Sequence, residues 1–252
     1  MSKVIVITGA SSGIGAATAR LLARRGHSLA LAARSQDAVE KVAHDCGVNA
    51  IAVVTDVTDR AQVNALVSQT IERLGPIDVW INNAGQGITR EPSQLTDDDV
   101  DTMVRVNIKS VLYGMQAILP HFKDRNAGHI INISSMLGRM PHATFRSAYT
   151  GSKHFVNAIT AMIRTEIQQT HPEIQVSLVS PGVVRTDFGK NALHGGPDSN
   201  TLPYSQSAEE VAEVIAGVIE SRAPDVYTRS GAAKRVADYY ASIGTDPPAA
   251  SS

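Results

Sequence analysis

Tyr149 and Lys153 are the first pair of side chains in this sequence whose types and spacing suggest chemistry. They lie four residues apart in the stretch SAYTGSK, which runs directly into a segment with helical apolar periodicity. Residues four apart share one face of a helix, so the phenol and the ammonium project side by side. A nearby cation favours the phenolate and lowers the pKa of a phenol from its ordinary value of about 10. The pair therefore predicts a general acid for reducing a carbonyl group, or a base for oxidising an alcohol.

Two further polar residues lie where they would complete this chemistry. Ser135 directly follows the apolar run IINIS, and its hydroxyl can donate a hydrogen bond to a substrate oxygen as charge develops there. Asn107 lies inside the helical stretch MVRVNIKSV, where a polar side chain is otherwise unfavourable. Each residue also has a structural interpretation: Tyr149 and Lys153 as a surface pair, Ser135 as a strand-end cap, Asn107 as a buried amide satisfied by carbonyls. The chemical interpretation is favoured, because rejecting it would require the structural interpretations of all four residues to be true together.

A glycine-rich loop near the N-terminus predicts a phosphate-binding turn. TGASSGIG (8–15) follows the apolar run VIVIT and opens the first helix. Gly9, Gly13 and Gly15 allow a tight turn, close approach of the backbone to a phosphate, and close packing of the helix. The free N–H groups and the positive dipole end of that helix would then face a pyrophosphate. The spacing is Gly-x-x-x-Gly-x-Gly, so a turn that only joins strand to helix remains an alternative.

Apolar runs and helical stretches alternate along the chain and indicate its fold. The runs are apolar on both faces, as in strands that helices cover on both sides. The predicted strands are 4–8, 29–33, 50–55, 79–83, 130–134, 176–180 and, more weakly, 225–228. The predicted helices are 17–26, 37–47, 59–75, 96–122, 148–168 and 207–221. We therefore predict an α/β fold: a single domain (1–243) with a doubly wound, Rossmann-like parallel sheet of about seven strands and helices on both faces.

Composition narrows the classes of partner. The 252 residues carry 23 Lys and Arg against 24 Asp and Glu, and this balance argues against nucleic acid or an anionic membrane. Cys46 is the only cysteine, which excludes an internal disulfide and fits a reducing compartment. The apolar run from Val4 to Ile7 is too short for a signal sequence, and no run reaches membrane-spanning length. We expect a cytoplasmic protein and no metal site.

Taken together, the motifs point to one family. In order, they are TGASSGIG, the Asp-Val pair at 56–57, NNAG (82–85), Asn107, Ser135, Tyr-x-x-x-Lys (149–153) and PGVVRT (181–186). With these motifs, the sequence resembles the short-chain dehydrogenase/reductase family, in its compact single-domain branch. The resemblance implies an oxidoreductase that uses a nicotinamide dinucleotide. The cofactor-binding residues that we expect are Gly9, Ser11, Ser12, Gly13, Ile14, Gly15, Arg34, Asp56, Val57, Asn83, Ala84, Gly85, Tyr149, Lys153, Pro181, Gly182, Val184 and Thr186.

The resemblance also implies individual roles. In the family, the acid at Asp56 hydrogen-bonds the adenine amino group, and the lysine at Lys153 bonds the nicotinamide ribose. Val184 and Thr186 would contact the nicotinamide carboxamide. Asn107 would hold a water that connects to the lysine and completes a proton relay. Asp56 keeps a simpler alternative, as an acid at a helix N-terminus or in a loop.

The end of the second strand predicts which coenzyme is used. NAD-preferring folds place an acid there, which binds the adenosine ribose and would repel a 2′-phosphate. This chain has the uncharged Ala33, followed by Arg34, whose planar cationic fork suits a phosphate. Relatives with an arginine just after this strand generally prefer NADP. Ser12 departs from the second basic residue that many such relatives carry, so we expect a moderate preference for NADP(H) over NAD(H), unless Arg34 is only a solvated loop charge.

We expect an enzyme that interconverts a carbonyl and an alcohol in a small-molecule substrate. The alternative is a non-catalytic dinucleotide-binding sensor or regulatory protein on the same fold, which usually lacks the tyrosine or the lysine. The segment after Ser135 and the loop 187–206 should line the substrate pocket. Four basic residues lie in or next to these segments: Arg139, His142, Arg146 and Arg185. They either bind an anionic group of the substrate or are solvated loop charges, and we favour the second alternative.

Three expectations concern regions outside the catalytic motifs. The loop 187–206 is rich in Gly, Pro, Asn and Ser and should be a mobile substrate lid. The tail 244–252 should be disordered. The helices 96–122 and 148–168 carry more apolar residues than one sheet face covers, and relatives pair these helices across a two-fold axis, so we expect a homo-oligomer, a tetramer or a dimer. The apolar residues concerned are Val111, Met115, Ile118, Phe155, Ile159 and Met162.

Overall fold

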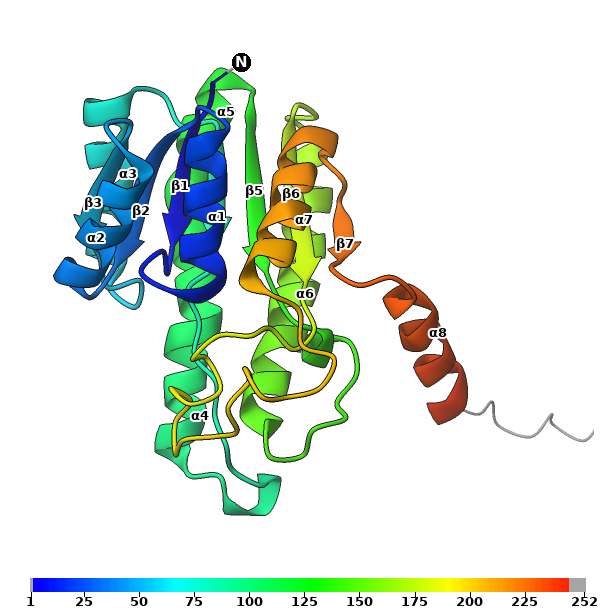
Figure 1. Cartoon of the computed structure of the whole chain (residues 1–252). Helices are drawn as coiled ribbons and strands as arrows, with labels where there is room; N and C mark the ends of the chain where they lie inside the picture. The colour runs from blue at the N-terminus through cyan, green and yellow to red at the C-terminus, as the bar shows by residue number, and fades with distance from the viewer. Residues whose placement is uncertain (1, 245–252) are drawn as a thin grey trace, which may run out of the picture.

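A computed structural model describes residues 2–244 of the chain. Its centre is a seven-stranded sheet in which every pair of neighbouring strands is parallel, in the order β3-β2-β1-β4-β5-β6-β7 (Figure 1). The strands are β1 (Val4–Thr8), β2 (Ser28–Ala33), β3 (Ala50–Val54), β4 (Val79–Asn82), β5 (Gly128–Ile133), β6 (Ile174–Ser180) and β7 (Asp225–Tyr227). The predicted α/β class and doubly wound sheet are confirmed, whereas the single-domain assignment for 1–243 stays a prediction.

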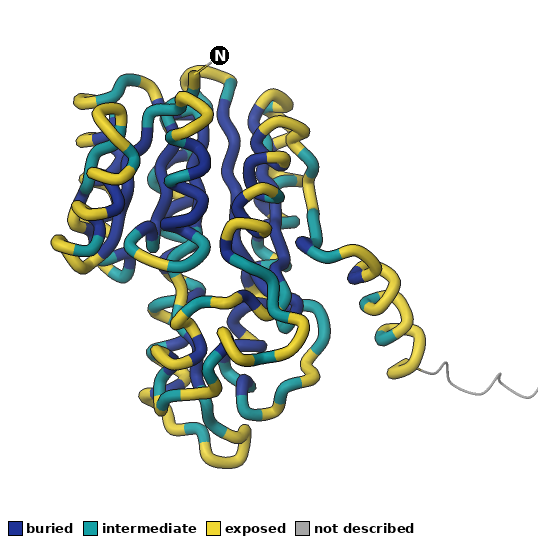
Figure 2. Tube along the Cα trace, in the orientation of Figure 1, coloured by how far each residue is buried: buried dark blue, intermediate teal, exposed yellow. Residues whose placement is uncertain are grey.

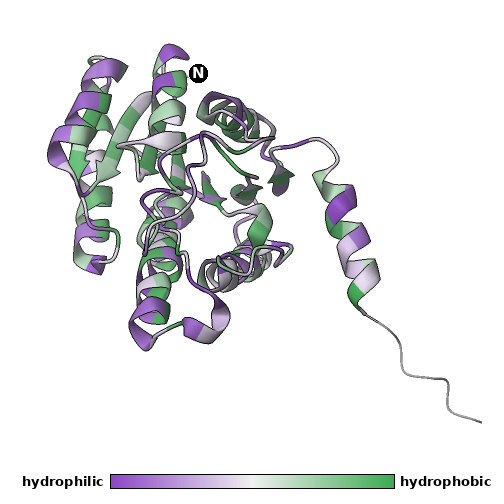
Figure 3. Ribbon diagram, turned by 60° about the horizontal axis from the view of Figure 1, so that its bottom comes forward, coloured by the Kyte–Doolittle hydropathy of each residue, from purple (hydrophilic) through white to green (hydrophobic). Residues whose placement is uncertain are grey.

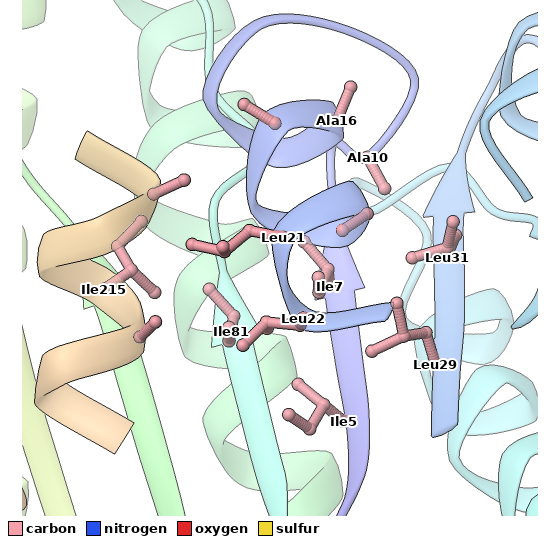
Figure 4. Packing of buried hydrophobic residues seen from close by; sticks show 14 of the residues in the cluster. Ile5, Ile7, Ala10, Ala16, Leu21, Leu22, Leu29, Leu31, Ile81 and Ile215 are labelled. Atoms are coloured by element: carbon pink, nitrogen blue, oxygen red, sulfur yellow. The ribbon is translucent and has the colours of Figure 1, made fainter. Parts of the chain in front are cut away.

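Helices cover both faces of this sheet. The α-helices within residues 2–244 are α1 (Gly13–Arg24), α2 (Gln36–Cys46), α3 (Arg60–Leu74), α4 (Asp97–Met103), α5 (Ser110–Arg125), α6 (Ser147–Gln168), α7 (Ala208–Ser221) and α8 (Ala232–Ile243), and six of them pack on the sheet. One apolar cluster joins the sheet to α1, α2 and α7, and a second joins its other face to α3, α5 and α6. Successive strand residues point to opposite faces, so Ile5 and Ile7 lie in the first cluster, as Figure 4 shows, and Val6 lies in the second. This alternation explains why the strands read as continuous apolar runs.

Local signals in the sequence set several helix ends. The carboxylate of Asp59 accepts hydrogen bonds from the first amides of α3, and Gly75, with φ of 90°, ends that helix. Ser207 and Glu210 form a capping box at the start of α7. Thr96 and Asp99 form a second capping box, which starts α4.

The long helix predicted over 96–122 is interrupted in the structure. A π-helical segment, Val104–Lys109, separates α4 from α5. The segment carries Asn107, which is fully buried and hydrogen-bonds the backbone of Gln86 through both polar atoms of its amide. Local widening of a helix to π geometry is typical of functional sites. Apolar periodicity did not reveal this interruption, because the segment keeps a helical pattern.

The C-terminal helix α8 was not among the predicted helices. It stands away from the sheet, and most of its residues are exposed, as Figures 1 and 2 show. Figure 3 shows that it mixes polar and apolar residues. The tail predicted to be disordered lies, apart from Gly244, outside the described residues. Within residues 2–244, no helix is long and apolar enough to cross a membrane.

The apolar surplus on which the assembly prediction rests is smaller than expected. Val111, Met115 and Ile118 are buried in the cluster that joins α5 to the sheet, so that part of the reasoning is wrong. On α6, by contrast, Phe155 is 42% exposed and Met162 is 62% exposed. These two side chains are the part of the predicted contact surface that the sheet leaves uncovered.

Candidate active site

The predicted site residues gather at the carboxyl edge of the sheet, where the parallel strands all end (Figure 1). The glycine loop follows β1, NNAG overlaps the end of β4, Ser135 follows β5, and Pro181 follows β6. The first turn of α6 carries Tyr149. One edge of the sheet therefore brings together motifs that lie far apart in the sequence, from the glycine loop at 8–15 to the segment 181–186.

Lys153 is buried beneath this edge. Its Nζ atom donates a hydrogen bond to the Ile133 carbonyl oxygen over 2.9 Å and lies 5.7 Å from the centre of the Tyr149 ring. Burial penalises the ammonium form and lowers the pKa of Lys153 to about 8. The two side chains share one face of the helix as predicted.

The prediction that Lys153 lowers the pKa of Tyr149 is wrong for this structure. Burial raises the pKa of Tyr149 to about 12, and the groups that oppose this rise are the Ser135 hydroxyl and the Arg146 guanidinium. The phenol also packs edge-on against Phe188 of the loop 187–206, with ring centres 5.6 Å apart. Tyr149 is therefore protonated at neutral pH, the state that donates a proton.

Ser135 and Asn107 both lie close to the pair. The Ser135 hydroxyl accepts a hydrogen bond from the Leu137 amide over 3.1 Å, and its influence on Tyr149 shows that it faces the phenol. A β-carbon placed on Gly85 would lie 3.2 Å from Asn107 Oδ1 and 3.7 Å from Lys153 Nζ. Gly85 thus separates the amide from the ammonium, and the absence of a side chain there leaves room between them.

The glycine loop has the backbone geometry that its sequence predicts. Gly9 and Gly13 have φ of 64° and 52°, in the left-handed region that glycine tolerates. A β-carbon on Gly15 would overlap the Gly9 carbonyl oxygen. Ser12 precedes α1 without capping it through its side chain, so the first amides of this helix remain available for an anion. These features fit the pyrophosphate of a dinucleotide.

The sequence did not predict a set of hydrogen bonds that connects this loop to the segment after β4. The amide of Asn83 donates hydrogen bonds to the carbonyl oxygens of Thr8, over 2.9 Å, and Gly9, over 3.1 Å. The Thr8 hydroxyl accepts from the backbone amides of Asn83 and Ala84. Asn83 therefore positions the loop through its side chain, and Thr8 joins the set of site residues. The feature of the sequence that could have indicated this role is the hydroxyl of Thr8, which ends the otherwise apolar strand β1.

A cleft of about 270 Å³ lies beside the loop. Ser11, Ser12 and Gly13 line it from one side and Thr186 from the other. A β-carbon on Gly13 would lie 3.1 Å from Thr186 Cγ2, so the predicted motifs at 8–15 and 181–186 border one space. Pro181, Gly182 and Val184 lie in the backbone that leads into Thr186.

The residues that predict coenzyme choice lie at the ends of β2 and β3. Arg34 is exposed directly after β2 and, within residues 2–244, forms no ion pair. Asp56 uses its Oδ1 atom to accept hydrogen bonds from the Thr58 amide and hydroxyl, over 2.9 and 2.8 Å. Val57 beside it is buried. A guanidinium without an acidic partner is available to a ribose phosphate.

The loop 187–206 lies over the site and is tied to the segment 86–90. The Leu193 amide donates to the Gly87 carbonyl oxygen, and the Thr89 amide donates to the Leu193 carbonyl oxygen, each over 2.9 Å. His194 Nε2 lies 2.7 Å from Asp99 Oδ1, and Arg90 Nη1 lies 3.0 Å from Asp99 Oδ2. These contacts hold the loop against the segment 86–90, and its role as a mobile lid stays a prediction.

The four basic residues considered as anion-binding groups have different surroundings. Arg139 pairs with Asp225, and Arg185 donates to the Ser205 carbonyl oxygen. His142 is exposed. Arg146 alone of the four is buried. The described residues hold no group of His, Cys, Asp or Glu side chains arranged for a metal ion.

Comparison with known proteins agrees with this geometry. An uncharacterized oxidoreductase of Staphylococcus saprophyticus is 42% identical over 189 residues, which are 74% of this chain and 76% of that protein. A short-chain dehydrogenase/reductase from Burkholderia phymatum in complex with NAD superposes with a TM-score of 0.88 at 26% identity, covering 98% of this chain and 97% of the other. An alcohol dehydrogenase from Thermococcus sibiricus complexed with 5-hydroxy-NADP has a TM-score of 0.79 at 30% identity, over 90% and 96% of the two chains.

The sequence profile of the family described as short chain dehydrogenase matches residues 3–195. This range includes every predicted motif from the glycine loop to PGVVRT. The match, the relatives and the shared fold agree, and the chain therefore belongs to the short-chain dehydrogenase family of oxidoreductases.

Proposed function

We propose that this protein is an NADP(H)-dependent oxidoreductase that transfers hydride between the nicotinamide and a carbonyl/alcohol pair. The observation that carries the proposal is the buried Tyr149 phenol, which has Ser135 and Lys153 beside it at the carboxyl edge of the sheet. The bound coenzyme supplies the hydride. The residues of the chain bind it, orient the substrate and move the proton.

Each of four residues has a part in this proposal. Tyr149, protonated at neutral pH, donates a proton to the substrate oxygen during reduction and accepts it back during oxidation. Ser135 donates a hydrogen bond to the same oxygen. Lys153, which hydrogen-bonds the Ile133 carbonyl oxygen in this structure, binds the nicotinamide ribose. Asn107 links the lysine to solvent through a water.

The NADP preference rests on Arg34, which has no acidic partner in the described structure, and on the uncharged Ala33. The remaining expected cofactor contacts are part of the same proposal: the glycine loop, Asp56, NNAG and the segment 181–186. We also propose a homotetramer or dimer, on the exposed apolar residues of α6, and a cytoplasmic location, on the single cysteine.

The test measures NADPH consumption with a panel of ketones, aldehydes and keto esters, and NADP reduction with alcohols. Tyr149→Phe should keep coenzyme binding and lose turnover by about a hundredfold or more, because only the transferable proton is removed. Tyr240→Phe is the matched control, since Tyr240 is half exposed on α8. Normal turnover in Tyr149→Phe would remove the phenol from the mechanism. Coenzyme binding without any turnover by the wild type would favour the sensor alternative.

A further inference from the structure

Arg146 is a buried cation without an acidic partner. Its relative exposure is 9%, and within residues 2–244 it takes part in no ion pair. Its guanidinium donates a hydrogen bond from Nη1 to the Ile88 carbonyl oxygen over 3.0 Å. Buried charges in proteins are normally paired, because a neutral carbonyl compensates only part of the lost hydration. Arg146 therefore lacks the anion that its burial calls for.

The guanidinium lies beside the catalytic pair. A β-carbon on Gly87 would lie 2.9 Å from Arg146 Nη1 and 3.1 Å from Cε1 of Phe188, the ring that packs on Tyr149. Arg146 is also close enough to lower the pKa of the Tyr149 phenol. The cation and the Phe188 ring thus pack closely around Gly87, and the same ring packs on the phenol.

A polar group near Arg146 has no hydrogen-bond partner among the described residues. The Thr89 hydroxyl oxygen is buried and forms no hydrogen bond. A β-carbon on Gly196 would lie 2.8 Å from this oxygen and 3.0 Å from Arg146 Nη2. The Thr89 hydroxyl and Arg146 Nη2 therefore both lie close to one glycine of the loop 187–206, and the Gly189 carbonyl oxygen lies 2.6 Å from the same point. A group that accepts from both would satisfy them together.

We propose that Arg146 binds a carboxylate of the substrate, so that the reacting pair is an oxo acid and a hydroxy acid. A guanidinium presents parallel N–H donors that match the two oxygens of a carboxylate, and exclusion of water strengthens the bond. In the reduction, hydride adds to the carbonyl carbon and the Tyr149 proton to its oxygen, while the carboxylate is unchanged. This inference deepens the proposed function and rests on it.

Two other roles for Arg146 are open to the same test. The cation could act only on Tyr149 by favouring the phenolate, or only on the fold by holding the segment at Ile88. Either role would affect every substrate equally, whether charged or neutral. A carboxylate partner, in contrast, makes the effect of Arg146 depend on the charge of the substrate.

The experiment compares oxo acids with their methyl esters as matched probes. Pyruvate, acetoacetate and levulinate, which separate the two groups by different lengths, are reduced with NADPH by the wild type, Arg146→Gln and Arg146→Lys. Arg146→Gln should raise KM for the best acid by about 10-fold to 100-fold, the size of a hydrogen bond to a charged group, and change KM for its ester by less than about threefold. Arg146→Lys should recover part of the loss. The control is Arg125→Gln, because Arg125 pairs with Asp78, which precedes β4 and lies away from the carboxyl edge of the sheet.

A binding measurement separates this inference from the proposed function. Thermal shifts with NADPH present report binding of acids and esters to the wild type, to Arg146→Gln and to Tyr149→Phe, and NADPH binding checks that each variant is folded. Acid binding that depends on Arg146 supports the carboxylate site even if no probe is turned over. Equal binding of acids and esters by the wild type would overturn it. A loss of binding in Arg146→Gln that is equal for the acid and the ester would also overturn it. So would a shift, in Arg146→Gln, of the pH profile for reduction of the ester.

Discussion

Lys153 donates its Nζ hydrogen bond to the Ile133 carbonyl oxygen, at the last residue of β5, over 2.9 Å. The bond ties the second turn of α6 to the sheet, and it buries an amine that would otherwise be hydrated. Burial lowers the pKa of Lys153 to about 8, from 10.5. The folded protein thus releases this proton at a lower pH than the unfolded chain does, and the free energy of unfolding must depend on pH for this reason.

The sign of that dependence gives the first prediction. Below about pH 8 both states hold the proton and the folded state carries the penalty of a buried ammonium, which disappears as the pH rises toward 10.5. Relative to Lys153→Met, which cannot titrate, the wild type should gain about 2 kcal/mol in free energy of unfolding between about pH 7.5 and 10. Urea denaturation of both proteins measures the difference. A difference that does not change with pH would contradict the lowered pKa.

The second prediction concerns coenzyme choice. Arg34→Ala should remove most of the NADPH preference and change NADH use little, because the guanidinium contacts only the extra phosphate. Ala33→Asp should invert the preference by repelling that phosphate. The measurement is kcat/KM for both coenzymes, with Arg24→Ala, at an exposed arginine of α1, as the control. A higher kcat/KM with NADH in the wild type would show that the strand end was misinterpreted.

The third prediction concerns the anchoring of the lid. Hydrogen bonds to the Asp99 carboxylate, first that of His194, hold its pKa at about 2. Asp99→Asn should therefore speed hydrogen exchange at Leu193 and Thr89, whose amides bond across the lid contact. Asp45→Asn, which removes an exposed pair with Arg20, should leave their exchange unchanged.

The same carboxylate predicts an acid dependence. Because the pKa is lowered in the folded state, the stabilisation by Asp99 is present above the ordinary value of 3.8 and is lost as the pH falls toward about 2. The difference in thermal stability between the wild type and Asp99→Asn should shrink over that range.

The loop 187–206 should also exchange its amide hydrogens more slowly with NADPH bound. Equal exchange with and without the coenzyme would argue against a lid.

The fourth prediction concerns assembly. Light scattering should give a multiple of the 26.7 kDa chain mass, because Phe155 and Met162 leave apolar surface exposed on α6. A double substitution of both residues by Glu should lower the mass toward that of one chain. Val48→Glu, at a fully exposed position outside α6, should not change the mass. A single-chain mass for the wild type at micromolar concentration would refute the prediction.

Much of the fold could be predicted because it is encoded locally. Strands buried on both faces appear as apolar runs, and the capping box at Ser207 and the glycine at Gly75 mark helix ends through hydrogen bonds within a few residues. Periodicity predicts neither the helix α8 nor the π-helical interruption at Val104–Lys109. In this segment Asn107 accepts a hydrogen bond from the Gln86 amide and donates one to the Gln86 carbonyl oxygen, contacts between separate parts of the chain that periodicity does not contain.

By itself, the sequence determined which chemical groups are present and at which spacing: a phenol and an amine one helical turn apart, and glycines where backbone approaches backbone. Only the tertiary structure decided their electrostatic state. Burial raises the pKa of Tyr149 against the opposing effects of the Ser135 hydroxyl and the Arg146 guanidinium. Arg146 is buried without an acidic partner, whereas Arg139 pairs with Asp225. Hydration and pairing depend on residues brought together from distant parts of the chain, and spacing along the sequence does not record them.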